Sequence, residues 1–99
     1  MKKEKLKSMP YAQAQIITDN DEFVTLISYV TPVCGFDKDG WFRINGLYSA
    51  TTRKHIGAFM KERCNSNYQM AKRCYEENLM YNIYTGRIIS RETGEIIVM

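Results

Sequence analysis

The only histidine of the chain lies in a short run of side chains suited to holding an anion. Thr51 and Thr52 supply hydroxyl groups. Arg53 and Lys54 supply positive charge, and His55 follows directly. If a helix begins here, its free main-chain N–H groups add donors that hold phosphate or carboxylate. The run therefore indicates binding of an anionic group and names no reaction.

Nucleophilic catalysis is the main chemical alternative. The chain has three cysteines, Cys34, Cys64 and Cys74. A cysteine enzyme needs a thiolate beside a base and an orienting third group, and no family-type cysteine pattern surrounds any of the three. A lone histidine in a basic helix turn is more often a surface or capping residue, so we expect His55 to be one and the protein not to be an enzyme. A small enzyme using Cys34 and His55 stays an open alternative.

Metal and cofactor binding have less support. The cysteines and His55 lack the short ligand spacings of structural zinc sites, and buried cysteines behave as small apolar residues. The acidic pairs Asp19/Asp21 and Asp37/Asp39 fall where turns are expected, and turn formation explains them. No glycine-rich phosphate loop is present. We expect neither a metal nor a cofactor.

Positive charge is concentrated in the expected helices and at the start of the chain. The net charge is +3, but residues 49–73 carry six cations against one glutamate, and residues 1–8 carry four lysines against one glutamate. Such a patch attracts phosphate or an acidic protein surface. The predicted binding residues are Thr51, Thr52, Arg53, Lys54, His55, Lys61, Lys72 and Arg73.

Aromatic residues accompany these cations at Trp41, Tyr48, Tyr68 and Tyr75. Cations with rings suit nucleic acid, where charge meets phosphate and rings stack on bases. The same mixture is typical of protein interfaces. The alternatives are that the cations form a solvated face and that the rings fill the core.

Ninety-nine residues make one domain. We expect a disordered basic tail over residues 1–9 and a single α+β domain over residues 10–99. Strands are predicted over residues 11–18, 23–30, 33–36, 41–47, 79–84, 87–90 and 96–99. Helices are predicted from residue 49 or 51 to residue 64, and from residues 66–69 to residues 76–78.

Local signals define these boundaries. Asp37 to Gly40 is typical of a hairpin turn, and Pro32 indicates a strand end or an edge. Ser49 or Thr51 is suited to cap the first helix, and Ser66 to Gln69 predicts a capping box for the second. Gly57, inside the first helix, suggests close packing against the sheet.

The order of elements predicts an α+β fold, a small antiparallel sheet built from hairpins with two helices on one face. The other face then needs polar residues or a partner. The apolar end, residues 96–99, could pair two copies by edge addition, so a homodimer is one open state. An odd number of cysteines, no secretory signal and no membrane-spanning run favour a cytoplasmic protein without a membrane partner.

Two segments resemble a family of small uncharacterised proteins carried by phages, plasmids and other mobile elements of Gram-positive and gut bacteria. The matching residues are the Ser-Tyr-x-Thr run at 28–31, the Tyr-Ser-x-Thr-Thr-x-x-His-Ile run at 48–56 and residues 81–86. The resemblance covers residues 25–86 and carries over no catalytic residues. It implies a mobile-element setting, in which small proteins often bind host machinery, including as inhibitors of CRISPR effectors.

The sequence thus predicts a non-enzymatic binding protein. Its basic helical face is expected to dock on a host defence or nucleic-acid-handling complex, possible partners being a host protein or nucleoprotein. The alternative is a regulatory protein of the element that binds DNA or RNA directly. Against it, the sequence shows no known helix-turn-helix or RNA-binding pattern.

Overall fold

The computed structural model describes residues 1–98 and contains eight strands and two helices. The strands are β1 (Lys2–Glu4), β2 (Ala14–Thr18), β3 (Val24–Ser28), β4 (Thr31–Phe36), β5 (Trp41–Ile44), β6 (Leu79–Asn82), β7 (Ile88–Ser90) and β8 (Ile96–Val98). The helices are α1 (Ala50–Arg63) and α2 (Tyr68–Glu76).

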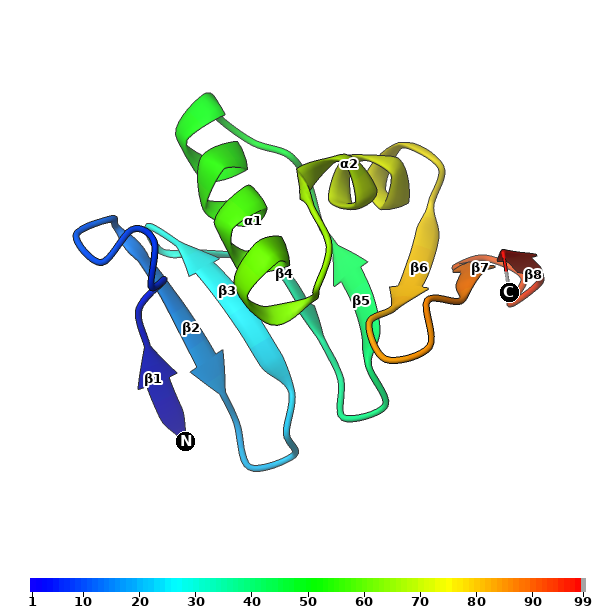
Figure 1. Ribbon diagram of the computed structural model, residues 1–99, viewed down its shortest axis with the longest axis horizontal. Helices are drawn as coiled ribbons and strands as arrows, with labels where there is room; N and C mark the ends of the chain where they lie inside the picture. Colours follow the sequence, from blue (N-terminus) through cyan, green and yellow to red (C-terminus); the bar gives the residue numbers. More distant parts are fainter. Residues whose placement is uncertain (99) are drawn as a thin grey trace.

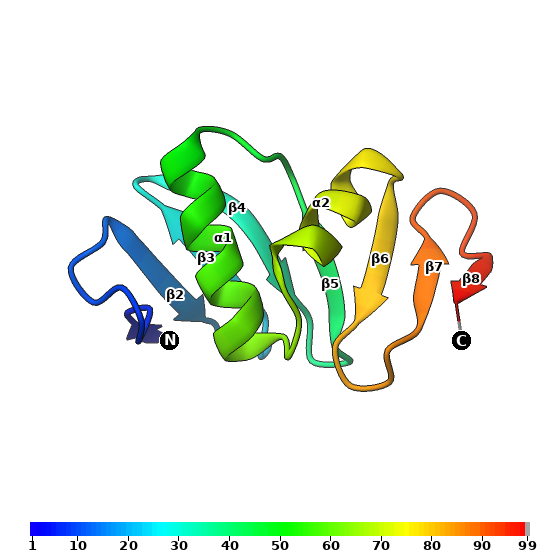
Figure 2. The same cartoon turned by 45° about the horizontal axis from the view of Figure 1, so that its top comes forward.

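All eight strands form one antiparallel sheet in the order β1-β2-β3-β4-β5-β6-β7-β8, so each strand pairs with its neighbours in the sequence. Both helices lie between β5 and β6 in the chain and cover the same face of the sheet (Figure 1). The turned view in Figure 2 shows the same single helical layer. The predicted α+β fold is confirmed.

Alternation along the strands separates the two faces of the sheet. In β3, Val24, Leu26 and Ser28 are buried, whereas Thr25 and Ile27 are only half-buried. Side chains two residues apart in a strand share a face, so the buried set faces the helices. The opposite set lies on a face that neither helix covers (Figure 1).

The hairpin turns form where acidic side chains satisfy main-chain donors. The carboxylate of Asp19 accepts hydrogen bonds from the main-chain N–H groups of Asp21 and Phe23. The carboxylate of Asp37 does the same for Asp39 and Trp41. The predicted turn roles of both acidic pairs are confirmed, because this local hydrogen bonding needs no tertiary contact.

Pro32 is the second residue of β4, so it lies near a strand end as expected, although this strand is central and not an edge. It pairs opposite Ile27, and the register of β3 and β4 shifts between Leu26 and Ile27. A bulge accommodates proline in the pairing, because proline lacks an N–H donor. β4 begins at Thr31, two residues before the predicted start at Val33.

Capping residues begin both helices. Ser49 accepts from the main-chain N–H of Thr52, which confirms one of the two predicted caps of α1. In α2 the cap is Asn67, which accepts from the N–H of Met70, and not Ser66 as a capping box predicts. Either side chain offers an oxygen, and the backbone selects Asn67.

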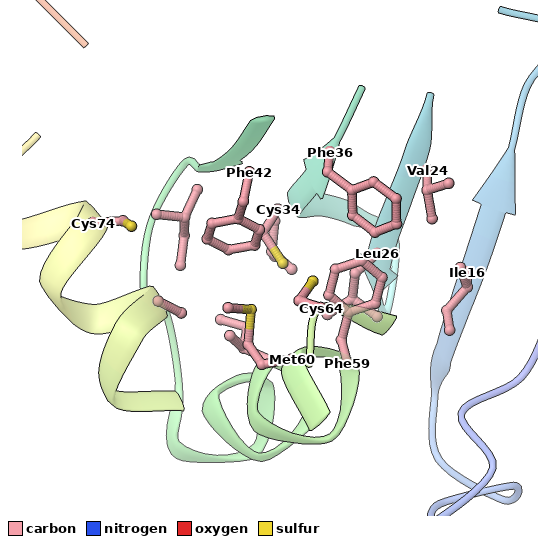
Figure 3. Packing of buried hydrophobic residues seen from close by; sticks show 14 of the residues in the cluster. Ile16, Val24, Leu26, Cys34, Phe36, Phe42, Phe59, Met60, Cys64 and Cys74 are labelled. Atoms are coloured by element: carbon pink, nitrogen blue, oxygen red, sulfur yellow. The ribbon is translucent and has the colours of Figure 1, made fainter. Parts of the chain in front are cut away.

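The core lies between the sheet and the helices (Figure 3). Its largest fully buried side chains include Phe42, Phe59 and Met60. The rings of Phe36 and Phe59 pack with their centroids 6.0 Å apart. Gly57 faces the other helix and not the sheet as expected, since a Cβ there would lie 3.5 Å from Cβ of Tyr68.

The start of the chain is ordered, unlike the disordered tail expected over residues 1–9. Lys2–Glu4 pairs with β2 as an edge strand, and Leu6 is fully buried in the core. The lysine-rich composition does not reveal this strand. Lysines are common on edge strands, and strand pairing uses only main-chain groups.

The carboxylate of Glu62 in α1 holds the segment that follows β1. It accepts from the N–H groups of Lys7 (2.6 Å) and Ser8 (3.0 Å), and from the Ser8 hydroxyl (2.6 Å). Burial alone would raise the pKa of Glu62, but the hydrogen bonds from Ser8 and Lys7 lower it below its ordinary value.

The chain ends in the expected hairpins. β6 and β7 pair across residues 83–87, and β7 pairs with β8. The predicted last strand reaches Met99, which lies outside the described residues. Within residues 1–98 no helix has the length and apolar character needed to cross a bilayer.

Candidate functional site

A buried polar cluster lies where α1 begins over the end of β3. The Ser28 hydroxyl is 2.9 Å from Oγ1 of Thr52 and 2.8 Å from Nδ1 of His55. Ser28, Thr52 and His55 are only 2%, 5% and 1% exposed. Buried polar groups need hydrogen-bond partners, and these three side chains are hydrogen-bond partners of one another.

The hydroxyls form a hydrogen-bonded chain that ends at the imidazole. Ser49 donates to Oγ1 of Thr52 at 3.3 Å. The Thr52–Ser28 and Ser28–His55 hydrogen bonds can each run in either direction, because each hydroxyl both donates and accepts. When Ser28 donates to Nδ1, His55 is neutral with its proton on Nε2. Burial also lowers the pKa of His55 below its ordinary value.

Two tyrosines at strained backbone positions adjoin this cluster. Tyr29 (φ 58°) directly follows the cluster residue Ser28, and Tyr48 (φ 55°) directly precedes Ser49, which bonds to Thr52. Their side chains are 54% and 48% exposed, and the Tyr29 ring lies 5.9 Å from the His55 ring. Bulky residues rarely adopt positive φ, and such strain often marks functional sites.

The cluster brings together residues far apart in the sequence. Ser28 and Tyr29 come from the 28–31 run, and Ser49, Thr52 and His55 come from the 48–56 run. Sequence reasoning did not assign Ser28 to the site. The available signal was a serine at an inward-facing position of an apolar strand, which needs a buried partner.

The predicted binding residues divide into exposed and buried sets. Thr51, Arg53 and Lys54 are exposed at the start of α1, as is Lys61 near its end. Thr52 and His55 are buried, so they do not belong to a contact surface. The expectation of a surface or capping His55 is wrong, because this side of α1 packs over Ser28.

The basic residues of α2 contribute less free charge. Lys72 and Arg73 are half-buried. Nε of Arg73 lies 3.3 Å from the carboxylate of Glu77, and the exposed Glu76 adds a further negative charge. The structure therefore concentrates the unpaired positive charge on α1.

We call the exposed residues Thr51, Arg53, Lys54 and Lys61 the α1 basic face. Within residues 1–98, no ion pair involves its three cations. The first turn of α1 contains no acidic residue. The hydrogen bonds of Glu62 with Lys7 and Ser8 also bring the exposed Lys5 and Lys7 to the side of α1, which extends the positive surface.

The thiols are poor candidates for nucleophiles. All three cysteines are free and buried. Burial raises the pKa of Cys64 to about 12 and that of Cys74 to about 11, and it raises the pKa of Cys34 well above its usual range. The thiolate is the reactive form, and little of it forms near neutral pH.

No cluster of three His, Cys, Asp or Glu side chains within residues 1–98 has the arrangement of a metal site. Ser28 and His55 are within hydrogen-bonding distance, but no carboxylate orients the imidazole in the hydrogen bonds of this region, and both side chains are inaccessible. The arrangement is suited to fixing α1 over the sheet and presenting its outer surface.

Together, the fold and the cluster define a small α+β protein with one helical layer on an antiparallel sheet and a cationic helix outside. The model of a family of unknown function, DUF8033, matches residues 1–77, so the chain belongs to that family. The expectation of an uncharacterised family is thereby confirmed. The comparison with curated proteins finds no match, and neither does the comparison with solved structures.

Proposed function

We propose that this protein is a non-catalytic binding protein whose α1 basic face docks on an anionic partner. The observation that carries the proposal is the unpaired charge of Arg53, Lys54 and Lys61 on one exposed helix. Cations without an acid nearby are available for charge-assisted hydrogen bonds to carboxylate or phosphate.

The exposed tyrosines support a specific contact over simple solvation. Tyr29 and Tyr48 adjoin the start of α1, where Arg53 and Lys54 are exposed. Tyrosine and arginine are the residue types that most often anchor interfaces. The Tyr29 ring lies 5.9 Å from the buried His55 ring, and this contact restrains it relative to α1 and lowers the entropy cost of binding.

The resemblance to mobile-element proteins favours a host complex as the partner. We propose a host defence or nucleic-acid-handling complex, with α1 occluding its nucleic-acid channel or guide-bound surface, as an anti-CRISPR-type inhibitor does. A nucleic-acid channel is lined with cations, so an inhibitor with a basic face would bind an acidic rim or the bound nucleic acid.

The test compares charge reversal on α1 with charge reversal elsewhere. The variant is Arg53→Glu/Lys54→Glu, and the control is Lys38→Glu/Arg87→Glu, two exposed cations on other elements. Each tagged protein is used to capture partners from host lysate with and without nuclease, and mass spectrometry identifies them. We expect one complex to bind the wild type and the control after nuclease, and the α1 variant to lose it.

Two outcomes would contradict the proposal. Equal capture by the folded α1 variant would exclude the basic face as the contact. Loss of all capture after nuclease would instead favour the direct DNA- or RNA-binding alternative, which predicts a steep dependence of affinity on salt concentration.

A further inference from the structure

The sheet face opposite the helices contains a hollow of about 310 Å³. In the register of the sheet, Thr25 lies opposite Gly35, and Gly35 lies opposite Arg43. These three positions alternate with buried residues that face the helices, so they share the uncovered face. The principal residues lining the hollow are Phe23, Thr25, Pro32, Gly35, Arg43 and Arg91.

Gly35 forms the floor because no side chain fits there. A Cβ at this position would lie 2.3 Å from the carbonyl oxygen of Val24 and 3.2 Å from Cε1 of Phe23. The backbone of Gly35 lies against β3 and has no side chain on this face, and Phe23 forms an apolar wall beside it. The hollow is therefore a feature of the strand packing itself.

Two arginines border the hollow, and each is held by groups beside it. Nη1 of Arg91 donates to the carbonyl oxygen of Ile44 at 3.3 Å. Nε of Arg43 lies 3.3 Å from the Met80 sulfur. These contacts use one N–H of each guanidinium, and a guanidinium has five. Both side chains thus retain donors for a ligand.

No acidic residue lines the hollow, so nothing in its lining neutralises the charge of the two arginines. Within residues 1–98, the one carboxylate in an ion pair with either arginine is that of Asp37, 3.7 Å from Nη2 of Arg43. An exposed pair at that distance contributes little. Planar guanidinium groups are suited to bidentate contacts with phosphate oxygens.

The same face carries a further cation and a further ring. Lys3 lies opposite Ile17, which lies opposite Thr25, so Lys3 shares the uncovered face at the β1 edge. Strands are about 4.8 Å apart, which separates β1 from β5 by about 19 Å. Trp41 alternates with the buried Phe42 and therefore faces the same side as Arg43.

We propose that this uncovered face binds single-stranded nucleic acid, with a phosphate held between Arg43 and Arg91 and a base stacked on Phe23. Cations along an open surface neutralise the phosphates of a single strand, and aromatic rings beside them stack on its bases. The half-buried rings of Phe23 and Trp41 supply stacking surfaces. This site lies on the side of the sheet away from α1, and the inference does not rest on the proposed function.

The test is fluorescence anisotropy with a labelled single-stranded oligothymidylate of twelve nucleotides. The variant Arg43→Gln/Arg91→Gln removes two cations from the hollow, and Arg53→Gln/Lys54→Gln removes two from α1 as the matched control. We expect the hollow variant to lose at least tenfold in affinity and the control less than threefold. The slope of log K against log salt should fall by about 1.4 for the hollow variant.

A charge-neutral variant separates stacking from electrostatics. Phe23→Leu keeps the charge and the apolar wall but removes the ring, so we expect roughly a tenfold loss of affinity with an unchanged salt slope. If Arg91→Gln impairs folding by losing the bond to Ile44, Arg43→Gln alone tests the site, because that side chain is 46% exposed.

The inference is overturned by any of three results. One is no binding by the wild type at low salt. Another is an α1 control that loses as much affinity as the hollow variant. The third is equal binding of a twelve-base-pair duplex, which would indicate general attraction to phosphate in place of a strand laid on the sheet.

Discussion

At the scale of single residues, the buried imidazole of His55 determines how α1 meets the sheet. Its Nδ1 is hydrogen-bonded to the Ser28 hydroxyl, which in turn contacts Thr52 one turn away on the same helix. A protonated His55 would donate to Ser28, and Ser28 would then donate to Thr52. Burial of the ring favours its neutral form.

This preference predicts a pH-dependent stability. Burial lowers the pKa of His55 in the folded state, so below its ordinary value of 6.5 the unfolded chain binds a proton that the folded chain does not. The free energy of unfolding should therefore fall as pH drops from 7.5 to 5.5 and be fully recovered above that window. Urea unfolding at pH 5.5, 6.5 and 7.5 measures it.

The matched variant is His55→Asn, whose side-chain oxygen can accept from Ser28 as Nδ1 does. We expect it to be less stable at pH 7.5 but to lose less further stability on acidification. The two carboxylates with lowered pKa values, Glu4 and Glu62, titrate below this window. Equal pH slopes for wild type and variant would show that His55 is not the titrating group.

A second residue-scale prediction concerns Gly35. Its backbone lies so close to β3 that a Cβ would meet the Val24 carbonyl oxygen at 2.3 Å. We expect Gly35→Ala to lower the free energy of unfolding by about 1–3 kcal/mol, because the strands must separate to admit the methyl group. Urea unfolding tests this, and unchanged stability would mean that β3 and β4 adjust without cost.

Residue roles were predictable from sequence where they depend on neighbours in the chain. Asp19 and Asp37 bond main-chain groups two and four residues away, and Ser49 bonds a group three residues away. The contact between Ser28 and His55 spans 27 residues and depends on how α1 lies over β3. No local sequence pattern indicates this contact, so the sequence alone predicts a surface position for His55.

At the scale of elements, the hydrogen bonds that Glu62 accepts from Lys7 and Ser8 explain why a lysine-rich segment is ordered. We predict that Glu62→Ala releases residues 5–8, because three hydrogen bonds to Lys7 and Ser8 are lost. Amide hydrogen exchange at residues 7 and 8 should accelerate, and trypsin should cleave faster after Lys5 and Lys7. Glu76→Ala, an exposed change in α2, is the control.

If Glu62→Ala leaves exchange and cleavage unchanged, burial of Leu6 alone orders this segment. Composition could not reveal either contact. Four lysines in eight residues are typical of a disordered tail, and Leu6, the one apolar residue between Met1 and Met9, gives no periodic pattern. The partner Glu62 lies more than fifty residues away, beyond the reach of local signals.

Gly57 gives a prediction of the opposite sign. It lies inside α1, and a Cβ there would meet only Cβ of Tyr68, at an ordinary contact distance of 3.5 Å. Alanine has the higher helix propensity, so Gly57→Ala should raise the free energy of unfolding by up to about 1 kcal/mol. A loss of stability in urea unfolding would show that α1 and α2 are packed too tightly for the methyl group.

At the scale of the whole molecule, the sheet separates two positive surfaces. The α1 basic face lies on one side, and Arg43, Arg91 and Lys3 lie on the other. The net charge of +3 conceals this division, because acidic residues gather in the hairpin turns. Charge counts along the sequence identified the first surface. The second depends on strand register and was not predicted.

The last prediction concerns the boundary of the family match. DUF8033 covers residues 1–77, whereas β6 pairs with β5, and the core includes Leu79 and Ile88 from the strands beyond the match. A chain ending at residue 77 would expose the edge of β5 and remove both side chains from the core. We expect it to lose cooperative thermal unfolding, as followed by circular dichroism.

A chain ending at Arg91 is the matched control, since it removes the last turn and β8 but keeps Leu79 and Ile88. We expect it to unfold cooperatively, with a midpoint only a few degrees lower than that of the full chain. Cooperative unfolding of the 77-residue chain would instead mean that five strands and two helices form a self-sufficient unit. In that case β6–β8 would be an appended hairpin array, and Arg91 would belong to a part of the molecule separable from the sheet it borders.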